Sequence, residues 1–241
     1  MNIHDLRLGS VKALLEQAGW TLPDAERVGE TGFVQGLIDA LCELSTRDAL
    51  TGAMNRRAFN TQLAGELDRV ARSGESSLLL MIDIDHFKQV NDRYGHLAGD
   101  AVIRAIGQTL LECVRPMDTV ARFGGEEFAV VLPNCQSSFA EVVAERIRAR
   151  VQDMSVQIPD ADPISVTVSC GGAFALPWLR TQAEEWVGRA DAQLYRAKAS
   201  GRNTVCIDPL VVTEVSAEEK GLLFGLTSDD PGMMETSAGD R

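Results

Sequence analysis

Three acidic residues are the part of this sequence best suited to chemistry. Glu126 and Glu127 stand side by side after Gly124 and Gly125, and Asp83 follows an apolar run earlier in the chain. Adjacent carboxylates repel each other unless a cation lies between them, and Mg²⁺ binds through a few carboxylate oxygens together with substrate phosphates. The residue types therefore indicate a magnesium site that acts on phosphates. For an isolated Gly-Gly-Glu-Glu sequence, two solvated acids beside a turn would be the simpler interpretation.

The surrounding pattern predicts elements that bring these acids together. Residues 119–123 and 128–132 are apolar runs, and the glycine pair between them predicts a tight β-hairpin with positive φ angles at the glycines. Its tip would hold both glutamates in the open. Residues 77–84 predict a buried strand whose end carries Asp83. In a ferredoxin-like or palm fold that strand end lies beside the central hairpin, so the three acids would meet.

The order of the elements predicts an α+β fold of the ferredoxin-like or polymerase-palm type. A central antiparallel sheet flanked by helices should form a catalytic domain over residues 47–208. Helices are predicted where apolar residues recur at helical spacing, and strands where they alternate or run together. The further helices are expected over 55–73, 86–93, 99–113, 137–151 and 181–200, and the further strands over 164–170 and 204–207.

The regions that flank this domain differ from it in character. Residues 1–46 are predicted to be helical, with a stripe of apolar residues at helical spacing. The stripe could pack on the chain's own domain or serve as a dimerising stalk, and both interpretations stay open. Residues 209–241 are acidic and rich in serine and glycine, which predicts a largely flexible tail. The apolar stripe within residues 1–46 consists of Phe33, Leu37, Ile38, Leu41 and Leu44.

Composition argues against several classes of partner. The chain has 241 residues and a formal net charge of −12, so the broad basic surface that nucleic acid or an anionic membrane would need is not expected. The longest apolar run is too short to span a bilayer and the N-terminus does not read as a signal peptide, which predicts a cytoplasmic protein. The five cysteines include no Cys-x-x-Cys pair, so neither a zinc site nor a disulfide framework is expected.

Four motifs connect the acids to a known family. They are Asp48-x-Leu50-Thr51-Gly52-x-x-Asn55-Arg56-Arg57, Asp83-x-Asp85-His86-Phe87-Lys88-x-x-Asn91-Asp92-x-x-Gly95-His96-x-x-Gly99-Asp100, the glycine-glutamate hairpin, and Ala190-Asp191-x-x-Leu194-Tyr195-x-Ala197-Lys198-x-x-Gly201-Arg202-Asn203. Because all four motifs occur in the same order as in that family, the segment over 48–207 resembles the GGDEF domain, the catalytic unit of diguanylate cyclases. The hairpin differs from the family name only in having Glu126 where aspartate is the other common choice.

The resemblance implies an activity and a set of binding residues. A GGDEF diguanylate cyclase binds one GTP per subunit, and the two subunits of a homodimer join their GTP molecules into cyclic di-GMP. By this resemblance Asp83, Glu127 and the Ile84 carbonyl would ligate Mg²⁺, for which Mn²⁺ is a substitute. Glu126 would hold a second metal and help to deprotonate the attacking hydroxyl. The implied substrate contacts are Asn91 and Asp100 for guanine, Phe87 and Lys88 at the phosphate loop, and Lys198 and Arg202 for the terminal phosphates.

A separate Arg-x-x-Asp pattern runs from Arg115 to Asp118, with five residues between it and Gly124. In the family this position is an inhibitory site for the product. By resemblance Arg115 would pair with a phosphate or guanine of cyclic di-GMP, and Asp118 would accept hydrogen bonds from a guanine edge. Arg146, on the following helix, would add a further contact. A surface ion pair is the simpler interpretation of the bare pattern.

Several residues of the motifs allow more than one interpretation. Asp85 and Asp92 are interpreted as turn or capping residues rather than ligands, and His96 as a hydrogen-bonded loop residue. Arg122 could support the hairpin acids or reach a phosphate. Two rival functions are a catalytically silent domain that senses GTP or cyclic di-GMP, and a cyclase that makes a mixed dinucleotide. The intact hairpin acids disfavour the first rival, and Asp100 at the base-reading position disfavours the second.

Overall fold

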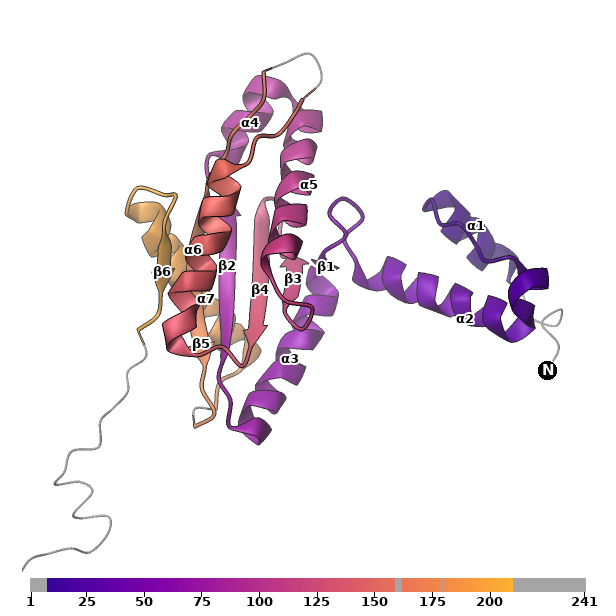
Figure 1. Cartoon of the computed structure of the whole chain (residues 1–241), viewed down its shortest axis with the longest axis horizontal. Helices are drawn as coiled ribbons and strands as arrows, with labels where there is room; N and C mark the ends of the chain where they lie inside the picture. Colours follow the sequence, from indigo (N-terminus) through magenta and orange to yellow (C-terminus); the bar gives the residue numbers. More distant parts are fainter. Residues whose placement is uncertain (1–7, 159–161, 179, 210–241) are drawn as a thin grey trace, which may run out of the picture. The chain divides into compact units, whose positions relative to one another are not determined.

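Strand β2 (Ser77–Ile84) is buried along its whole length and lies in the interior of a six-stranded sheet (Figure 1). It pairs antiparallel with β4 (Glu127–Pro133) on one side and with β5 (Val168–Ala175) on the other. A strand that is flanked on both sides and covered on both faces has no solvated positions, so its sequence reads as a continuous apolar run. The run that predicted this strand therefore also explains its interior place.

The outer strands add a parallel pair at each edge of the sheet. β3 (Thr119–Arg122) pairs antiparallel with β4, and β1 (Met54–Asn55) lies parallel beside β3. At the other edge β6 (Val205–Ile207) lies parallel to β5. The strand order is β1-β3-β4-β2-β5-β6. This sheet, antiparallel at its centre and flanked by helices, confirms the predicted α+β fold.

Helices cover both faces of the sheet. On one face, side chains of two helices form a single apolar cluster with Leu79 and Met81 of β2. The indole N–H of Trp186 in this cluster donates to the Ala173 carbonyl at 2.8 Å, which fixes a helix to β5. These helices are α3 (Arg56–Ser73) and α7 (Ala183–Ala199), while α5 (His96–Cys113) and α6 (Ser137–Asp153) lie over the other face and the short α4 (Phe87–Tyr94) precedes α5 (Figure 1).

The computed structural model describes residues 8–158, 162–178 and 180–209. The prediction of a flexible tail over 209–241 therefore lies outside the described residues, except at Pro209. Within the described ranges, no helix combines the length and the hydrophobicity that crossing a bilayer requires.

One predicted strand begins later than expected. The alternating pattern over 164–170 predicted a strand, but β5 begins at Val168 and continues to Ala175. Ile164 makes only an isolated bridge with Val156. The predicted end at residue 170 was also wrong, because glycines usually weaken a strand, whereas Gly171 lies inside this one. It does so because α7 packs so closely that no side chain fits there.

The helical N-terminal region consists of α1 (Gly9–Gln17) and α2 (Ala25–Thr46), as predicted. Leu15 of α1 is buried in a small cluster with Phe33 and Leu37 of α2. Most of the predicted stripe on α2 therefore packs against α1 of the same chain. Ile38 is the exception, since it is 48% exposed.

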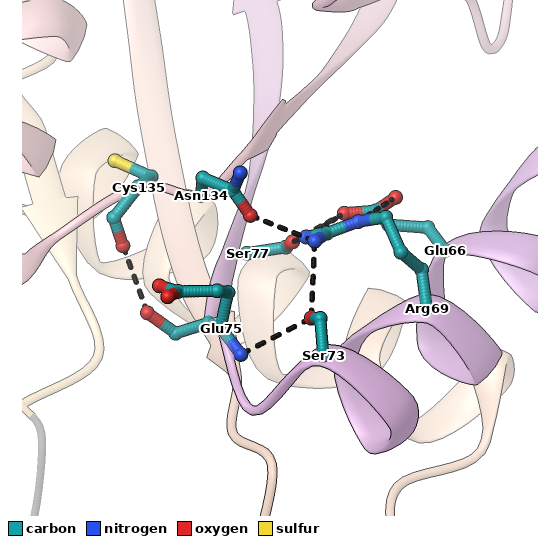
Figure 2. A network of polar contacts seen from close by, with 8 residues as sticks. Glu66, Arg69, Ser73, Glu75, Ser77, Asn134 and Cys135 are labelled. Atoms are coloured by element: carbon teal, nitrogen blue, oxygen red, sulfur yellow. Dashed lines mark hydrogen bonds and ion pairs between the residues drawn. The ribbon is translucent and has the colours of Figure 1, made fainter.

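A polar network ties α3 to the start of β2 and to the turn after β4 (Figure 2). The buried carboxylate of Glu66 accepts hydrogen bonds from Arg69 at 2.8 and 3.0 Å and from the Ser77 hydroxyl. Arg69 also donates to Oδ1 of Asn134 at 2.7 Å. A buried charge is tolerated only when it is paired and hydrogen-bonded, and here both conditions are met. The network thereby fixes the position of the turn that contains Asn134.

We predict that Gly171→Ala strongly destabilises the fold. A Cβ atom at this position would lie 2.0 Å from the backbone nitrogen of Leu194 and 2.4 Å from the carbonyl oxygen of Ala190, so α7 and β5 would have to separate. We expect the free energy of unfolding to fall by about 3 kcal/mol or more. Gly65→Ala is the control, because open space surrounds Gly65 in α3 and the alanine should add about 0.5–1 kcal/mol. Equal stabilities of the two variants in urea unfolding would contradict the close contact.

Candidate active site

Asp83 and Glu127 lie directly opposite each other where β2 ends and β4 begins. The neighbouring residues are joined as well, since the Ile84 N–H donates to the Glu126 carbonyl at 3.3 Å. Directly opposed residues of an antiparallel pair have their Cβ atoms about 5 Å apart on the same face of the sheet. Two carboxylates that are distant in the sequence therefore come together at one strand end, as the sequence predicted.

The tip of the hairpin differs from the prediction in two respects. Glu126 and Glu127 are half-buried rather than in the open, and neither Gly124 nor Gly125 has a positive φ. The connection over 123–126 is longer than a two-residue turn, and longer hairpin loops are commonly built on turns with ordinary φ angles. Gly124 is required for a different reason, because a Cβ atom there would lie 2.4 Å from Oε2 of Glu127. The glycine makes room for the carboxylate.

Arg122 braces the hairpin, in agreement with the first of the two roles that its sequence position allowed. Its Nη2 and Nε donate to the Gly125 carbonyl at 2.8 and 3.2 Å. Its Nη1 forms an ion pair with Asp48 at 3.2 Å. Asp48 also accepts hydrogen bonds from the backbone and hydroxyl of Thr51, at 3.0 and 2.7 Å. The first family motif is thereby anchored to the hairpin, a contact that the sequence did not predict.

Lys198 of α7 reaches Asp83, with its Nζ 2.8 Å from Oδ2 of the carboxylate. The Asp83 side chain is 11% exposed and the lysine side chain 33%. Burial raises the pKa of the Asp83 carboxyl above its ordinary value, and the hydrogen bond and charge of Lys198 oppose that rise. The lysine therefore neutralises a carboxylate that the fold takes out of water.

Glu126 lies in the same electrostatic environment. Burial raises the pKa of its carboxyl above the ordinary value, the charges of Asp83 and Glu127 raise it further, and Lys198 opposes the rise. Arg202 likewise acts on the pKa of Asp83, which it lowers. The site thus combines three mutually repelling acids with two cations that offset them in part.

The donors present fit a hard divalent cation in kind. Carboxylate and carbonyl oxygens are the ligands that Mg²⁺ and Mn²⁺ prefer. In the part of the chain that the structure describes, however, no group of three or more His, Cys, Asp or Glu side chains is arranged to hold a metal ion. The Asp83 carboxylate is instead engaged by Lys198. The residue types therefore suit a metal, while the Asp83 carboxylate is paired with a lysine.

Asp85 has a structural role, in line with its interpretation as a turn residue. It is 5% exposed and accepts three hydrogen bonds. The donors are the hydroxyls of Thr167 and Ser169, both at 2.7 Å, and the backbone N–H of Asn203 at 2.9 Å. These bonds hold β5 and the turn after α7 to the end of β2. The only sequence signal for them was the alternation of hydroxyl residues along 165–169.

The turn between β2 and α4 carries groups that suit an anionic ligand. His86 has a φ of 57° and its side chain does not cap the helix. The first N–H groups of a helix have no intrahelical acceptor, so those at the start of α4 can donate to a ligand. Phe87 is buried and Lys88 is exposed, so the lysine adds a mobile positive charge. This arrangement suits the phosphate loop that the family resemblance implies.

Asn91 lies against the first turn of α5. A Cβ atom on Gly99 would lie 2.0 Å from Oδ1 of Asn91 and 3.0 Å from the Phe87 ring, so only glycine allows this contact. Asp100, the next residue, is exposed on α5. The two residues implied to read guanine therefore lie on adjacent helices.

Two further residues of this motif lie in helices. His96 was predicted to be in a loop but is the first residue of α5, because Gly95, with a φ of 83°, separates α4 from α5 without a longer connection. Asp92, interpreted as a turn or capping residue, is an exposed residue within α4. Arg202 lies outside any helix, since it follows the end of α7 and has a φ of 65°.

Arg115, Asp118 and Arg146 line one cavity of about 130 Å³. The Asp118 carboxylate accepts from the Arg115 backbone N–H at 2.7 Å, and Arg146 donates to the Cys113 carbonyl at 2.8 Å. Burial raises the pKa of the Asp118 carboxyl, while the Arg115 hydrogen bond and the charges of both arginines oppose the rise. Two guanidinium groups beside one carboxylate suit an anionic ligand that also carries N–H donors.

The wall of this cavity includes Asn134 and Cys135, which no sequence motif singled out. Asn134 has a φ of 52° and is held by Arg69 through the network of Figure 2. The Cys135 N–H donates to the Ser76 carbonyl at 3.2 Å, and its carbonyl accepts from the Ser76 hydroxyl at 2.9 Å. These contacts join segments distant in the sequence, and no local pattern indicates them.

Comparisons with known proteins agree with this geometry. The family model "Diguanylate cyclase, GGDEF domain" matches residues 45–204. Diguanylate cyclase A of Treponema denticola is 42% identical over 170 residues, which are 69% of this chain and 45% of that protein. The protein YhcK of Bacillus subtilis is 43% identical over 160 residues, which are 66% of this chain and 44% of that protein. The chain thus spans less than half the length of these curated relatives.

A solved structure extends the match beyond the sheet. It contains the coiled coil and GGDEF domain of DgcB from Caulobacter crescentus in complex with c-di-GMP. It is 30% identical in sequence, with a TM-score of 0.70, and the alignment covers 83% of this chain and 100% of that one.

We predict that Asp85→Asn lowers stability. An amide in place of the carboxylate would turn its NH₂ group toward one of the three donors described above, and one buried donor would lose its acceptor. We expect the free energy of unfolding to fall by about 1–3 kcal/mol. Asp92→Asn removes the same charge at an exposed position of α4 and should change it by less than about 0.5 kcal/mol. Thermal unfolding checks both, and an unaltered Asp85→Asn protein would show that the bonds contribute nothing.

Proposed function

The chain belongs to the GGDEF domain family of diguanylate cyclases, and on this premise we propose that it condenses two GTP molecules into cyclic di-GMP and two pyrophosphates. The observation that carries the proposal is the cross-strand pairing of Asp83 with Glu127 beside Glu126 and Lys198. This arrangement keeps every acid that the chemistry requires. The presence of these acids supports a working cyclase over a silent domain.

The proposed reaction forms one bond and breaks one bond at each of two phosphorus atoms. The 3′ oxygen of one GTP attacks the α-phosphorus of the other, the bond from that phosphorus to the oxygen bridging the β-phosphate breaks, and pyrophosphate leaves. A second attack with the roles exchanged closes the ring. We assign the hydroxyl proton to Glu126, because burial and neighbouring charges raise the pKa of its carboxyl and so favour holding a proton.

We assign the metal ligands to Asp83, the Ile84 carbonyl and Glu127, with Glu126 directed toward a second ion. The cross-strand pair supports this assignment, since it supplies two carboxylates at one strand end. Mg²⁺ or Mn²⁺ bound there would neutralise charge on the triphosphate. The protein's own contribution is to hold its ligands on two paired strands, where their spacing is fixed.

The groups around the acids suit a guanine nucleotide. Asn91 offers both donors and an acceptor, and the Asp100 carboxylate offers acceptors only, which matches a guanine edge that carries a carbonyl oxygen beside N–H donors. The N-terminus of α4 with Phe87 and Lys88 would hold the phosphates from one side. Lys198 and Arg202 would hold the terminal phosphates from the other, as a point charge and a planar fork.

We further propose that the protein works as a homodimer in the cytoplasm, where GTP is available. Each protomer contributes one nucleotide site, and the reaction requires two nucleotides face to face. Residues 47–208 would form the catalytic domain, and residues 1–46 would set the geometry of the dimer. Ile38 and Val28 of α2 support this role, because they remain 48% and 44% exposed beside the cluster formed with α1.

The cavity of Arg115, Asp118 and Arg146 is the proposed inhibitory site for cyclic di-GMP. Its two guanidinium groups would pair with phosphate or with the acceptor edge of guanine, and Asp118 would accept from guanine N–H groups. The DgcB structure, which is a complex with c-di-GMP, makes this ligand a natural candidate. Product bound here would limit further synthesis.

We predict that Asp83→Asn and Glu127→Gln each lower kcat by about 100-fold or more, because each removes charge stabilisation at the reacting phosphates. Both variants should stay folded, and Asp68→Asn, which changes an exposed acid of α3, should keep full activity. Chromatography after incubation with GTP and Mg²⁺ measures the product. GTP binding without any product from the unaltered protein would instead indicate a silent sensor, and a mixed product on adding ATP would overturn the guanine assignment.

We predict that inhibition weakens at acidic pH through Asp118. The carboxylate must be ionised to accept from guanine, and burial raises its pKa above the ordinary value of about 3.9. Affinity for cyclic di-GMP should therefore be full at neutral pH and fall as the pH is lowered through that raised pKa. Burial raises the pKa of the Cys135 thiol in the cavity wall, so this neighbour stays neutral as the pH is lowered.

Calorimetric titration with cyclic di-GMP at several pH values measures this effect. Asp118→Asn should bind the ligand more weakly and without the acidic decline, because the amide does not titrate. If the variant and the unaltered protein decline in parallel, the effect does not arise from Asp118.

A further inference from the structure

The ion pair between Lys198 and Asp83 puts a cation on the carboxylate that we assign to the metal. The Nζ of Lys198 lies 2.8 Å from Oδ2 of Asp83. We propose that Lys198 occupies this carboxylate in the nucleotide-free protein and transfers to the triphosphate when metal and nucleotide bind together. The inference rests on the metal and phosphate assignments of the proposed function. It adds that Lys198 binds Asp83 before the nucleotide and metal arrive and binds the triphosphate afterwards.

The structure allows the lysine side chain to move while its backbone stays in place. The end of α7 is fixed, since the Ser200 N–H donates to the Arg196 carbonyl at 2.9 Å and the Arg202 N–H to the Ala197 carbonyl at 3.2 Å. The following turn is held by Asp85 through the Asn203 N–H. The Lys198 side chain, 33% exposed, is a compact charge on a flexible stem. Transfer therefore requires only side-chain rotation.

Charge balance explains why the Lys198 ammonium and a divalent metal ion exclude each other at the Asp83 carboxylate. The Asp83 side chain is 11% exposed, so water screens little of the repulsion between an ammonium and a divalent ion on the same carboxylate. In the described ranges no group of three or more His, Cys, Asp or Glu side chains is already arranged to hold a metal ion against the lysine. A triphosphate changes the balance, because its charged oxygens offer Lys198 a new partner and release Asp83.

A functional consequence follows from this exchange. Free metal should bind weakly to the empty site, and nucleotide should strengthen metal binding, with an equal reciprocal effect of metal on nucleotide affinity. The protein would then take up the metal and GTP as one unit. Lys198 would serve as the element that couples their binding.

The first test measures Mn²⁺ affinity of the nucleotide-free full chain by electron paramagnetic resonance. Lys198→Met and Lys198→Gln should both bind Mn²⁺ about fivefold or more tightly than the unaltered protein, because the competing cation is gone. Lys198→Arg keeps the charge and should bind as the unaltered protein does. Arg196→Met is the matched control: it removes an exposed cation of the same helix that pairs with Gln193, and it should change the affinity by less than about twofold.

Two further measurements locate the effect. Adding Asp83→Asn to Lys198→Met should abolish the gain, because the gain arises at that carboxylate. A GTP analogue that cannot react should tighten Mn²⁺ binding to the unaltered protein more than to Lys198→Met, since only the former has a lysine to transfer. Retained melting temperatures show that the variants are folded.

The outcomes separate this inference from the proposed function. If Asp83→Asn leaves Mn²⁺ binding in the presence of the analogue unchanged, the metal assignment itself is wrong. If Asp83→Asn weakens that binding but neither Lys198→Met nor Lys198→Gln tightens it in the empty site, the metal assignment stands and the competition by Lys198 is refuted.

Discussion

The backbone pairing of β2 with β4 holds Asp83 opposite Glu127, and the other features of the site depend on that register. Side chains along a strand alternate between its two faces, so a slip of one residue would move Asp83 to the opposite face and put an apolar neighbour in its place. Because β2 is apolar on both faces, alternation alone does not exclude this slip, and the close packing of Leu79 and Met81 in the cluster under α3 and α7 opposes it. Hydrophobic packing far from the reacting atoms thereby fixes the spacing of the carboxylates.

Two acids at the same strand end show how differently the fold can treat a buried carboxylate. Asp85 accepts three hydrogen bonds from uncharged donors that belong to fixed elements, so it cannot change partners without loosening the fold. Asp83 is balanced by one lysine on a flexible side chain. The first arrangement suits a structural role, and the second leaves the carboxylate available to another cation. Burial alone therefore does not distinguish a ligand from a structural acid, whereas the nature of the partner does.

The sequence was sufficient for the fold and for the meeting of the acids, because both depend on local patterns. The apolar run of β2 and the hairpin around the glycines predicted the pairing of Asp83 with Glu127. What the sequence could not predict were individual side-chain bonds between elements, because no local pattern records them. The bond from Lys198 to Asp83 and the brace of Arg122 on Asp48 are of this kind.

The end of the strand predicted over 164–170 was wrong for a related reason. Local alternation cannot report that a helix will lie against a glycine, and the close approach of α7 to Gly171 is a property of the assembled fold. The exposure of the hairpin acids was overestimated in the same way, since their burial arises from neighbouring elements.

The proposed inhibitory cavity and the acids lie at opposite ends of β4, and this separation limits how one can affect the other. Glu127 begins the strand, whereas Leu132 and Pro133 at its end line the cavity. Seven residues of strand span about 20 Å, and β4 is paired along both edges. A ligand in the cavity could displace Glu127 only by breaking these ladders, which would cost much of the stability of the domain. In the proposed homodimer, inhibition that keeps the fold intact would therefore act on how the two protomers approach each other, and not through distortion of the site within one protomer.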